Sequence, residues 1–271
     1  MDLVRQRVYI DFEKMKIAII GAGNMGGAIA RALAVGTYFT YSDITCTARS
    51  TSTLEKFDKR FNLSTDNREA VAGADIVLFA VKPWLMEEVV RDVAPCLDPT
   101  KQIVASVAAG VSFSQLTQWL GCSPAIFRII PNTAIEVGSG VTFISSCNAS
   151  GKTRGMILDM FSQMGYALEV EEDMMAAGTS LASCGIAYAM RYIQASVSGG
   201  VSLGFDEEQA RRIVEYTVRG ASELLLSTGN PPQVEIDKVT TPGGMTQRGL
   251  AAMEEAGFSA AVQAGLDGCL K

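Results

Sequence analysis

A glycine-rich turn near the start of the chain is the feature that most restricts the fold. Residues 17–20 are a short apolar, β-branched run, as in a buried strand, and residues 21–26 read GAGNMG. Ile29 and Leu33 then recur four residues apart among alanines, as on a helix. A strand, a G-x-G-x-x-G turn and a helix in this order indicate a unit that binds a dinucleotide.

Each glycine of this turn has a physical role in such a unit. Gly21 allows the tight turn, Gly23 has no Cβ and lets the backbone approach a pyrophosphate, and Gly26 lets the helix pack close to the strand. The phosphates would bind at the helix N-terminus, where unpaired N–H groups favour an anion. The alternative is a glycine-rich turn without a ligand, and the flanking strand and helix argue against it.

The composition is typical of a globular chain of one or two domains. Of 271 residues, 48% are hydrophobic and 19% are charged, which is enough to bury a sizeable core. A formal net charge of −6 and the lack of any basic run argue against nucleic acid as a partner. Residues 1–15 mix charges without an apolar segment, so we expect no signal peptide, a cytoplasmic protein and an N-terminal extension over residues 1–14.

The chain contains no histidine, which restricts the chemistry. Histidine is the usual general acid or base near neutral pH, and its absence excludes Ser-His-Asp and Cys-His catalytic sites. Proton transfer must use a lysine, a tyrosine or a carboxylate, or the reaction must need no strong proton relay. The six cysteines form no C-x-x-C pair and no metal-ligand spacing, so we expect reduced core residues and no metal site.

The end of the second strand, predicted over residues 44–48, indicates which dinucleotide is bound. An NAD site usually has an acidic residue there for the ribose 2′-hydroxyl, whereas this strand is followed by Arg49 and Ser50. Arg49 can pair with a 2′-phosphate and Ser50 can donate a hydrogen bond to it. Asp43, the nearest acid, precedes the strand. We therefore expect a preference for NADP; the alternative is a solvated loop arginine.

Alternating apolar and amphipathic segments predict a doubly wound parallel α/β domain over residues 15–171. The expected later strands are residues 74–81, 102–107, 125–130, 141–144 and 166–170, and the expected helices are residues 54–58, 84–93, 113–120 and 152–164. Ligands bind outside the carboxyl ends of such strands, where Lys82 and Ala108 lie. Lys82 is therefore either close to the nicotinamide or an ordinary surface lysine.

Residues 172–271 contain no convincing strand and predict an all-α domain. Residues 174–190 carry no charge, and residues 192–205 are a second uncharged run. Polar and small residues dilute both runs, so we expect no membrane span. A long helix without a charged face must be buried against another surface, which predicts an obligate homodimer or a larger homo-oligomer. An amphipathic helix is expected over residues 207–226, after a cap at Asp206.

A second candidate ligand loop is residues 239–246, which read VTTPGGMT. Thr241 is a good N-cap and Pro242 a good first residue for a helix that ends near Glu255. Two glycines in a first turn cost about 0.8–1.0 kcal/mol each relative to alanine, which makes sense if a ligand contacts the backbone there. Free N–H groups at this helix start would suit a carboxylate, with two threonine hydroxyls beside it. The alternative is an ordinary capped helix start.

Four motifs make the chain similar to the pyrroline-5-carboxylate reductases. They are GAGNMG at residues 21–26, AVKP at residues 80–83, RIIPNTA at residues 128–134 and TTPGGMT at residues 240–246. The last motif resembles the family signature T-S-P-G-G-x-T and is the most specific. The resemblance covers residues 16–266, nearly the whole chain.

The resemblance implies a Rossmann-type N-terminal domain, a helical C-terminal dimerisation domain, and homodimers that assemble further into decamers. It implies reduction of a small cyclic imino acid, 1-pyrroline-5-carboxylate, to proline with NADPH, or with NADH as the alternative donor. It places substrate contacts at Thr241, Gly243, Gly244 and Thr246, with Thr246 near the substrate nitrogen. Together with the turn, it assigns the cofactor to Gly21, Gly23, Asn24, Met25, Gly26, Arg49, Ser50, Asn67, Ala80, Val81, Lys82, Pro83 and Ala108.

Reduction of a cyclic imine is compatible with the missing histidine, because the iminium form is already electrophilic and nitrogen takes its proton readily from water. The chain departs from the family pattern G-S-G-P-A-Y at Cys184 and Ile186. Another cyclic imino acid is therefore an alternative substrate, and a non-catalytic NADP-binding regulator is an alternative of another class. A β-hydroxyacid dehydrogenase would need a lysine on the long helix, and none occurs between Lys152 and Lys238.

Overall fold

The computed structural model describes residues 15–270, which form two units that meet in sequence between Thr179 and Ser180. The extension predicted at residues 1–14 lies outside the described residues. The boundary predicted between residues 171 and 172 stays a prediction. Within residues 15–270, every helix is too short or too polar to reach across a bilayer.

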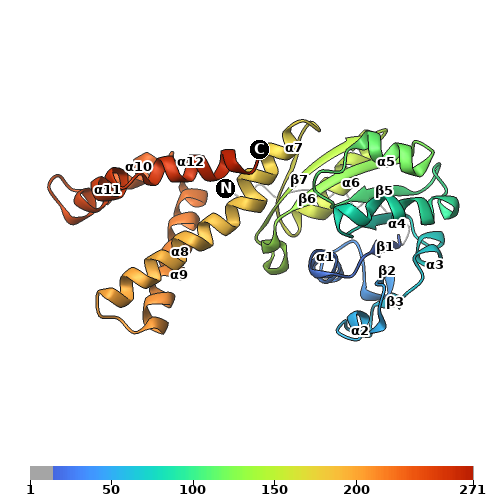
Figure 1. The fold of residues 1–271 in the computed structure, drawn as a ribbon, viewed down its shortest axis with the longest axis horizontal. Coiled ribbons are helices and arrows are strands. Elements are labelled where there is room, and N and C mark those ends of the chain that lie inside the picture. Colours follow the sequence, from blue (N-terminus) through green and yellow to red (C-terminus); the bar gives the residue numbers. More distant parts are fainter. Residues whose placement is uncertain (1–14, 271) are drawn as a thin grey trace, which may run out of the picture. The chain divides into compact units, whose positions relative to one another are not determined.

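The first unit is built on an eight-stranded sheet with the order β3-β2-β1-β4-β5-β6-β7-β8 (Figure 1). The six strands β1 to β6 are parallel. The chain crosses from one side of β1 to the other between β3 and β4, so the order reverses at the β1–β4 pair. The strands are β1 Ile17–Ile20, β2 Ile44–Thr47, β3 Asn62–Ser64, β4 Ile76–Phe79, β5 Ile103–Ser106, β6 Ala125–Pro131, β7 Gly140–Cys147 and β8 Gly165–Glu169.

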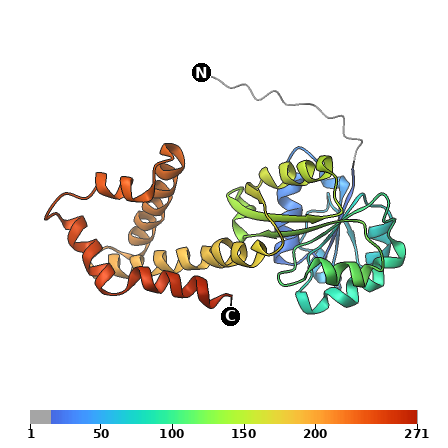
Figure 2. The ribbon, with the colours of Figure 1, turned by 90° about the horizontal axis from the view of Figure 1, so that it is seen from above.

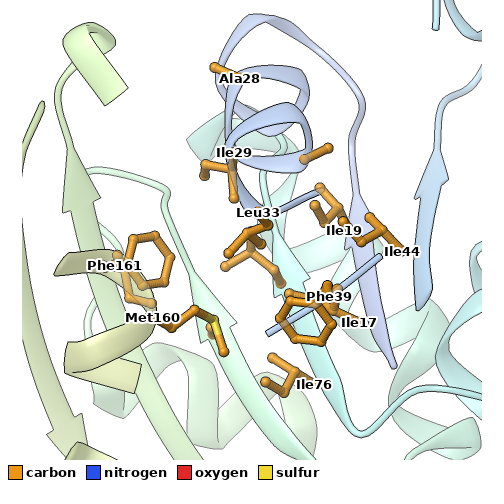
Figure 3. Close-up of a cluster of buried hydrophobic side chains, with 14 of the residues drawn as sticks. Ile17, Ile19, Ala28, Ile29, Leu33, Phe39, Ile44, Ile76, Met160 and Phe161 are labelled. Atoms are coloured by element: carbon orange, nitrogen blue, oxygen red, sulfur yellow. The ribbon is translucent and has the colours of Figure 1, made fainter. Parts of the chain in front are cut away.

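Helices cover both faces of this sheet (Figure 2). The helices are α1 Asn24–Ala34, α2 Thr51–Leu54, α3 Asn67–Ala72, α4 Met86–Val93, α5 Phe113–Leu120, α6 Gly151–Ser162 and α7 Met174–Gly178, with short 3-10 turns η1 Tyr41–Asp43, η2 Pro83–Leu85, η3 Ala94–Cys96 and η4 Thr133–Val137. On one face Ile29 and Leu33 of α1 pack with Met160 and Phe161 of α6 over Ile19 (Figure 3). Apolar side chains of α3, α4 and α5 form a second cluster with alternate residues of the same strands. The two strands at the centre, β1 and β4, are apolar throughout and buried on both faces.

The predicted fold class is confirmed, and β7 adds a feature that the sequence pattern did not indicate. β7 pairs antiparallel to β6, and β8 follows β7 in parallel, so these two strands run opposite to the first six. The connection between β6 and β7 is only the short turn η4, and a parallel crossover needs a dozen residues or more. Pro131 lies inside β6, paired with Thr142, whereas the predicted strand ended at residue 130.

The segment between β2 and β4 differs most from the prediction. The helix expected over residues 54–58 is wrong, since α2 ends at Leu54, and both β3 and α3 were missed. α3 begins where the Asp66 side chain accepts hydrogen bonds from the backbone N–H groups of Arg68 and Glu69. This cap stabilises a helix whose sequence, NREAVA, has too few apolar residues to show a period.

The second unit is entirely helical in its described part. A π-helical turn, η5 Thr179–Cys184, precedes α8 Gly185–Ser202, followed by α9 Glu207–Thr228, α10 Pro232–Lys238, α11 Met245–Glu255 and α12 Phe258–Gly268. The predicted cap of α9 is present, because the Asp206 carboxylate accepts from the Gln209 N–H at 2.8 Å. Helices α10 and α12 were not predicted.

Candidate functional site

The first candidate site lies at the carboxyl ends of β1 and β4, where the strand order reverses. Ligands of open α/β sheets bind at such a point. The turn after β1 is anchored to β2, since the carbonyl of Thr47 accepts from the N–H groups of Gly21 and Ala22 at 3.2 and 2.6 Å. Thr47 was not among the predicted site residues, and its position near the end of the second strand is its only signal in the sequence.

The glycines of the turn differ in what surrounds them. Gly21 has φ +108°, and a Cβ there would lie 2.9 Å from the carbonyl oxygen of Ala80. A Cβ on Gly26 would lie 2.1 Å from the carbonyl oxygen of Gly21, which is the close packing expected at this position. A Cβ on Gly23 would meet no protein atom within 4 Å, so packing within the chain does not require glycine there. Open space beside Gly23 fits a ligand that approaches the backbone at this residue.

The start of α1 is suited to an anion. Gly23 is its N-cap residue, and no side chain caps the helix. Asn24 and Met25 are its first two residues, and the first N–H groups of a helix lack intrahelical acceptors. The helix dipole adds partial positive charge at the same end. A pyrophosphate would satisfy both features.

Asn67 is held at the same edge of the sheet. It is the first residue of α3, and its side-chain oxygen accepts a hydrogen bond of 2.6 Å from the Thr47 hydroxyl. This bond orients the amide, because the oxygen faces Thr47 and the NH₂ group must face away from it. Thr47 therefore links the glycine turn, through its carbonyl, to Asn67, through its hydroxyl.

Arg49 and Ser50 follow β2 and are both exposed. Within residues 15–270 the Arg49 guanidinium has no ion-pair partner. The Ser50 hydroxyl lies 3.1 Å from the hydroxyls of Ser52 and Thr53. A free guanidinium beside clustered hydroxyls can bind a phosphate, which fits the expectation that these residues distinguish NADP from NAD.

The remaining predicted cofactor residues follow β4 and β5. The Ala80 N–H bonds the carbonyl of Ile20 at 2.8 Å, which ties the segment of residues 80–83 to β1. Lys82 is exposed at the start of η2, so both interpretations of this residue stay open. Ala108 is buried, and its N–H bonds the Ser106 hydroxyl at 3.2 Å.

The second candidate site is the loop before α11, and its geometry corrects the prediction. α11 begins at Met245 with Gly244 as N-cap, so the expected cap at Thr241 is wrong. Thr241 instead starts a β-turn, in which its carbonyl accepts from the Gly244 N–H at 2.9 Å and Gly243 has φ +71°. Proline followed by glycine at the centre of a turn favours this conformation over a helical first turn.

The turn also changes which amides are available to a carboxylate. The Gly244 N–H is used within the turn, and the Gly243 N–H donates to the Gln247 side chain at 2.6 Å. The expected pair of free glycine amides is therefore occupied in this conformation. The open donors of the loop are the N–H groups of Met245 and Thr246 in the first turn of α11. Thr246 is exposed beside them.

The loop is braced from within its own helix. The Arg248 guanidinium donates to the carbonyl of Gly243 at 2.7 Å, opposite the bond from Gln247 to the N–H of the same residue. Both contacts come from exposed side chains, which can rearrange when a ligand enters. No group of three or more Cys, Asp or Glu side chains in the described part of the chain could hold a metal ion.

Comparisons with known proteins match both units. The family model described as "Pyrroline-5-carboxylate reductase dimerisation" matches residues 172–271, and the model described as "NADP oxidoreductase coenzyme F420-dependent" matches residues 16–110. The pyrroline-5-carboxylate reductase of Aquifex aeolicus is 35% identical, with 92% of each chain covered. Pyrroline-5-carboxylate reductase 1 of Dictyostelium discoideum is 34% identical over 92% of this chain, which spans 48% of that longer protein.

A solved structure gives the same result. The pyrroline carboxylate reductase of Plasmodium falciparum, determined with NADP bound, has a TM-score of 0.87 and 26% identity, and the match covers 95% of this chain and 96% of that one. The match extends over nearly all of both chains, so it includes both units. The resemblance carried by the four motifs is confirmed, and the chain belongs to the pyrroline-5-carboxylate reductase family.

Proposed function

We propose that the chain reduces 1-pyrroline-5-carboxylate to L-proline with NADPH, the last step of proline biosynthesis. The observation that carries this proposal is the identity of about one third with pyrroline-5-carboxylate reductases across both units. The chain covers 92% of the Aquifex aeolicus enzyme, so neither unit is missing relative to that enzyme. The nucleotide-binding turn and the TTPGGMT loop supply a separate argument from the residues themselves.

The cofactor is proposed to bind along the carboxyl ends of β1, β2, β4 and β5. The N–H groups at the start of α1 hold the pyrophosphate, and the absent Cβ of Gly23 gives it room. The Asn67 amide, oriented by Thr47, donates to the cofactor at the same edge. Residues 80–83 and Ala108 contact the part of the cofactor closest to the nicotinamide.

Arg49 and Ser50 are proposed to bind the 2′-phosphate of NADPH. A charge-assisted hydrogen bond is worth about 1.5–3 kcal/mol, so one such bond favours NADPH over NADH by roughly tenfold to a hundredfold. NADH would lack this contact and would serve as the weaker donor.

The substrate carboxylate is proposed to bind the loop before α11. Its ligands are the N–H groups at the start of this helix together with the Thr241 hydroxyl, and Gly243 joins them when Gln247 releases its amide. Thr246 hydrogen-bonds the ring nitrogen. The turn at Gly243 and Gly244 keeps side chains away from the ligand, since neither glycine carries a Cβ.

The main task of the protein in this reaction is to hold the substrate in the correct position and orientation. When bound, NADPH supplies a hydride for the C=N carbon. The loop residues orient the ring, and Thr246 stabilises the nitrogen as it becomes an amine. That nitrogen is basic enough to take its proton from water, so the absence of histidine is no obstacle. Orientation of this kind can supply several kcal/mol of the barrier reduction.

Self-association is proposed to occur through the helical unit. The dimerisation model matches this part of the chain. The described side chains of this unit include apolar residues left largely open, such as Leu203 at 83% and Leu226 at 82% exposure. Exposed apolar surface of this extent marks an interface. We propose a homodimer as the basic assembly, with the decamer as the larger form, in the cytoplasm.

A second substrate is favoured by one observation. Cys184 and Ile186 replace the serine and proline that the family pattern has at these positions, so the pocket wall can differ. Side-by-side kinetics with five-membered and six-membered cyclic imino acids test this alternative. A higher kcat/KM for 1-pyrroline-5-carboxylate supports the main proposal, and a higher value for the six-membered ring supports another imino acid. NADPH binding without turnover of either substrate would indicate a regulator.

A further inference from the structure

Two cysteines that are distant in sequence meet in the helical unit. Cys184 is the N-cap residue of α8, and Cys269 is the C-cap residue of α12. Contacts of the residues one turn before and one turn after Cys184, Ser180 and Tyr188, with the end of α12 place the Cys184 side chain next to Cys269. The hydroxyl of Tyr188, one turn along α8, lies 2.7 Å from the Cys269 sulfur. Cys46 is buried, and Cys96 and Cys122 are half-buried against a core cluster, as expected, whereas the expectation of a core residue is wrong for the exposed Cys269.

Several contacts hold the two sulfur atoms in place. The Tyr188 hydroxyl donates to the carbonyl of Gly265 at 2.9 Å, and the buried Ser180 hydroxyl donates to the carbonyl of Leu266 at 2.7 Å. A Cβ on Gly265 would lie 3.6 Å from the Tyr188 ring, so α12 packs closely on α8 at this point. Figure 2 shows α12 running beside α8. The packing of the two helices therefore keeps the Cys184 and Cys269 side chains near each other.

The two thiols differ in ionisation and access. Hydrogen bonds from Tyr188 and then Cys184 lower the pKa of Cys269, whereas the hydrogen bond to Cys269, together with burial, raises the pKa of Cys184. The same contact with Cys269 raises the pKa of Tyr188 to about 12, so its hydroxyl stays protonated and can turn its hydrogen toward a thiolate. Cys269 is exposed and Cys184 is half-buried. A low-pKa exposed thiol beside a sheltered one is the arrangement of an attacking and a resolving cysteine.

We propose that Cys184 and Cys269 form a reversible disulfide when a hydroperoxide oxidises the protein. With hydrogen peroxide as the oxidant, the Cys269 thiolate attacks a peroxide oxygen, the O–O bond breaks, and Cys269 becomes a sulfenic acid while the other oxygen takes a proton and leaves as water. The Cys184 sulfur then attacks the sulfenic sulfur, the S–O bond breaks, and a second water leaves. Overall two thiols lose two electrons and two protons, and one hydroperoxide is reduced. A dithiol reductant reverses the reaction by exchange.

The disulfide closes a covalent loop around most of the helical unit. The loop runs from the start of α8 to the end of α12 and so includes the substrate loop before α11. It fixes the end of α12, which in the reduced chain is held by packing and hydrogen bonds against α8. The modification is separate from the proposed reductase reaction, and its detection does not depend on that activity.

Thiol counting on the full chain tests the proposal. The reduced protein is treated with hydrogen peroxide, its free thiols are alkylated, and its intact mass and peptide map are recorded. We expect six alkylated thiols before oxidation and four after it, with one linked peptide containing Cys184 and Cys269. A sulfinic acid at Cys269 with Cys184 still alkylated, or a disulfide between two chains, would overturn the proposal.

Variants separate the two thiols from the other cysteines. Cys269→Ser abolishes the link, and Cys184→Ser leaves a sulfenic acid at Cys269 that a sulfenic-specific reagent traps. Cys122→Ser is the matched control, since Cys122 is half-buried and lies in the first unit. This variant should still form the disulfide between Cys184 and Cys269. Tyr188→Phe retains the ring and removes the hydroxyl, so oxidation of Cys269 slows several-fold and the pH midpoint of its rate rises. An unchanged rate in this variant contradicts the assigned order of attack.

Discussion

Two glycines of the nucleotide-binding turn are expected to respond differently to the same substitution. A Cβ on Gly26 would lie 2.1 Å from a backbone oxygen, which the Thr47 carbonyl holds in place through the Gly21 N–H. The contact must open by more than 1 Å, and overpacking of this kind costs about 1–3 kcal/mol or more. We expect Gly26→Ala to lower the free energy of unfolding by about 3 kcal/mol and to weaken NADPH binding.

Gly23→Ala is expected to leave stability almost unchanged. Gly23 has φ −78°, which alanine adopts without strain, and a Cβ there meets no protein atom within 4 Å. Stiffening the unfolded chain stabilises by about 0.4–1 kcal/mol, and the loss of a good N-cap residue costs about as much. The net change is therefore within about 0.5 kcal/mol. NADPH affinity should nevertheless fall at least tenfold, which is about 1.4 kcal/mol, because the methyl group occupies the space of the pyrophosphate.

Urea unfolding of the ligand-free protein and titration with NADPH measure the two effects separately. Gly155→Ala is the matched control, because Gly155 lies in α6 and a Cβ there also meets no atom within 4 Å. It should leave NADPH binding unchanged. Wild-type NADPH affinity in Gly23→Ala would refute the assignment of the pyrophosphate to this turn.

Three further predictions concern single side chains. Arg49→Ala should raise the KM for NADPH at least tenfold and leave that for NADH unchanged, as steady-state kinetics with both donors would show. Glu172→Ala removes the ion-pair partner of the buried Arg128 at 2.9 Å and should lower the free energy of unfolding by about 1.5–3 kcal/mol, whereas Glu136→Ala, at an exposed pair, should cost about 0–1 kcal/mol in the same urea titration. Hydrogen bonds from Asn230 and then Lys238 lower the pKa of Glu235. The ionised Glu235 side chain therefore stabilises the fold above the ordinary glutamate pKa, and this stabilisation is lost as the pH falls through the lowered pKa. The free energy of unfolding of Glu235→Gln should therefore fall less steeply than that of the wild type as the pH is lowered. An identical fall in both proteins would contradict the stabilising role of ionised Glu235.

The prediction was most accurate for elements that a clear apolar pattern marks. β1 matches its predicted bounds, and so does α5, where an apolar period lies between the cap at Ser112 and the left-handed glycine at Gly121. The cofactor edge followed from the order of strand, turn and helix. Its contacts could not be predicted, since the bonds of Thr47 to the turn and to Asn67 depend on how the strands align.

The predictions of helix starts were wrong where local hydrogen bonds determine the start more than the apolar pattern does. The TTPGGMT stretch combines a good N-cap residue with proline, which predicts a helix start, yet proline and glycine at the centre of a turn delay the helix to Met245. The amides of Gly243 and Gly244 are then used by Gln247 and Thr241. α3 escaped prediction because its start depends on the Asp66 cap and not on an apolar period.

The central claim is that this chain is an NADPH-dependent reductase of a cyclic imino acid that uses the loop before α11. The most direct measurement is NADPH oxidation with 1-pyrroline-5-carboxylate by the wild type, Thr246→Ala and Thr246→Ser. We predict robust turnover by the wild type, a fall in kcat/KM of at least tenfold in Thr246→Ala, equivalent to about 1.4 kcal/mol of transition-state stabilisation, and substantial recovery in Thr246→Ser. Equal turnover by all three proteins would remove Thr246 from the site. No turnover by a wild type that binds NADPH would contradict the proposed reaction.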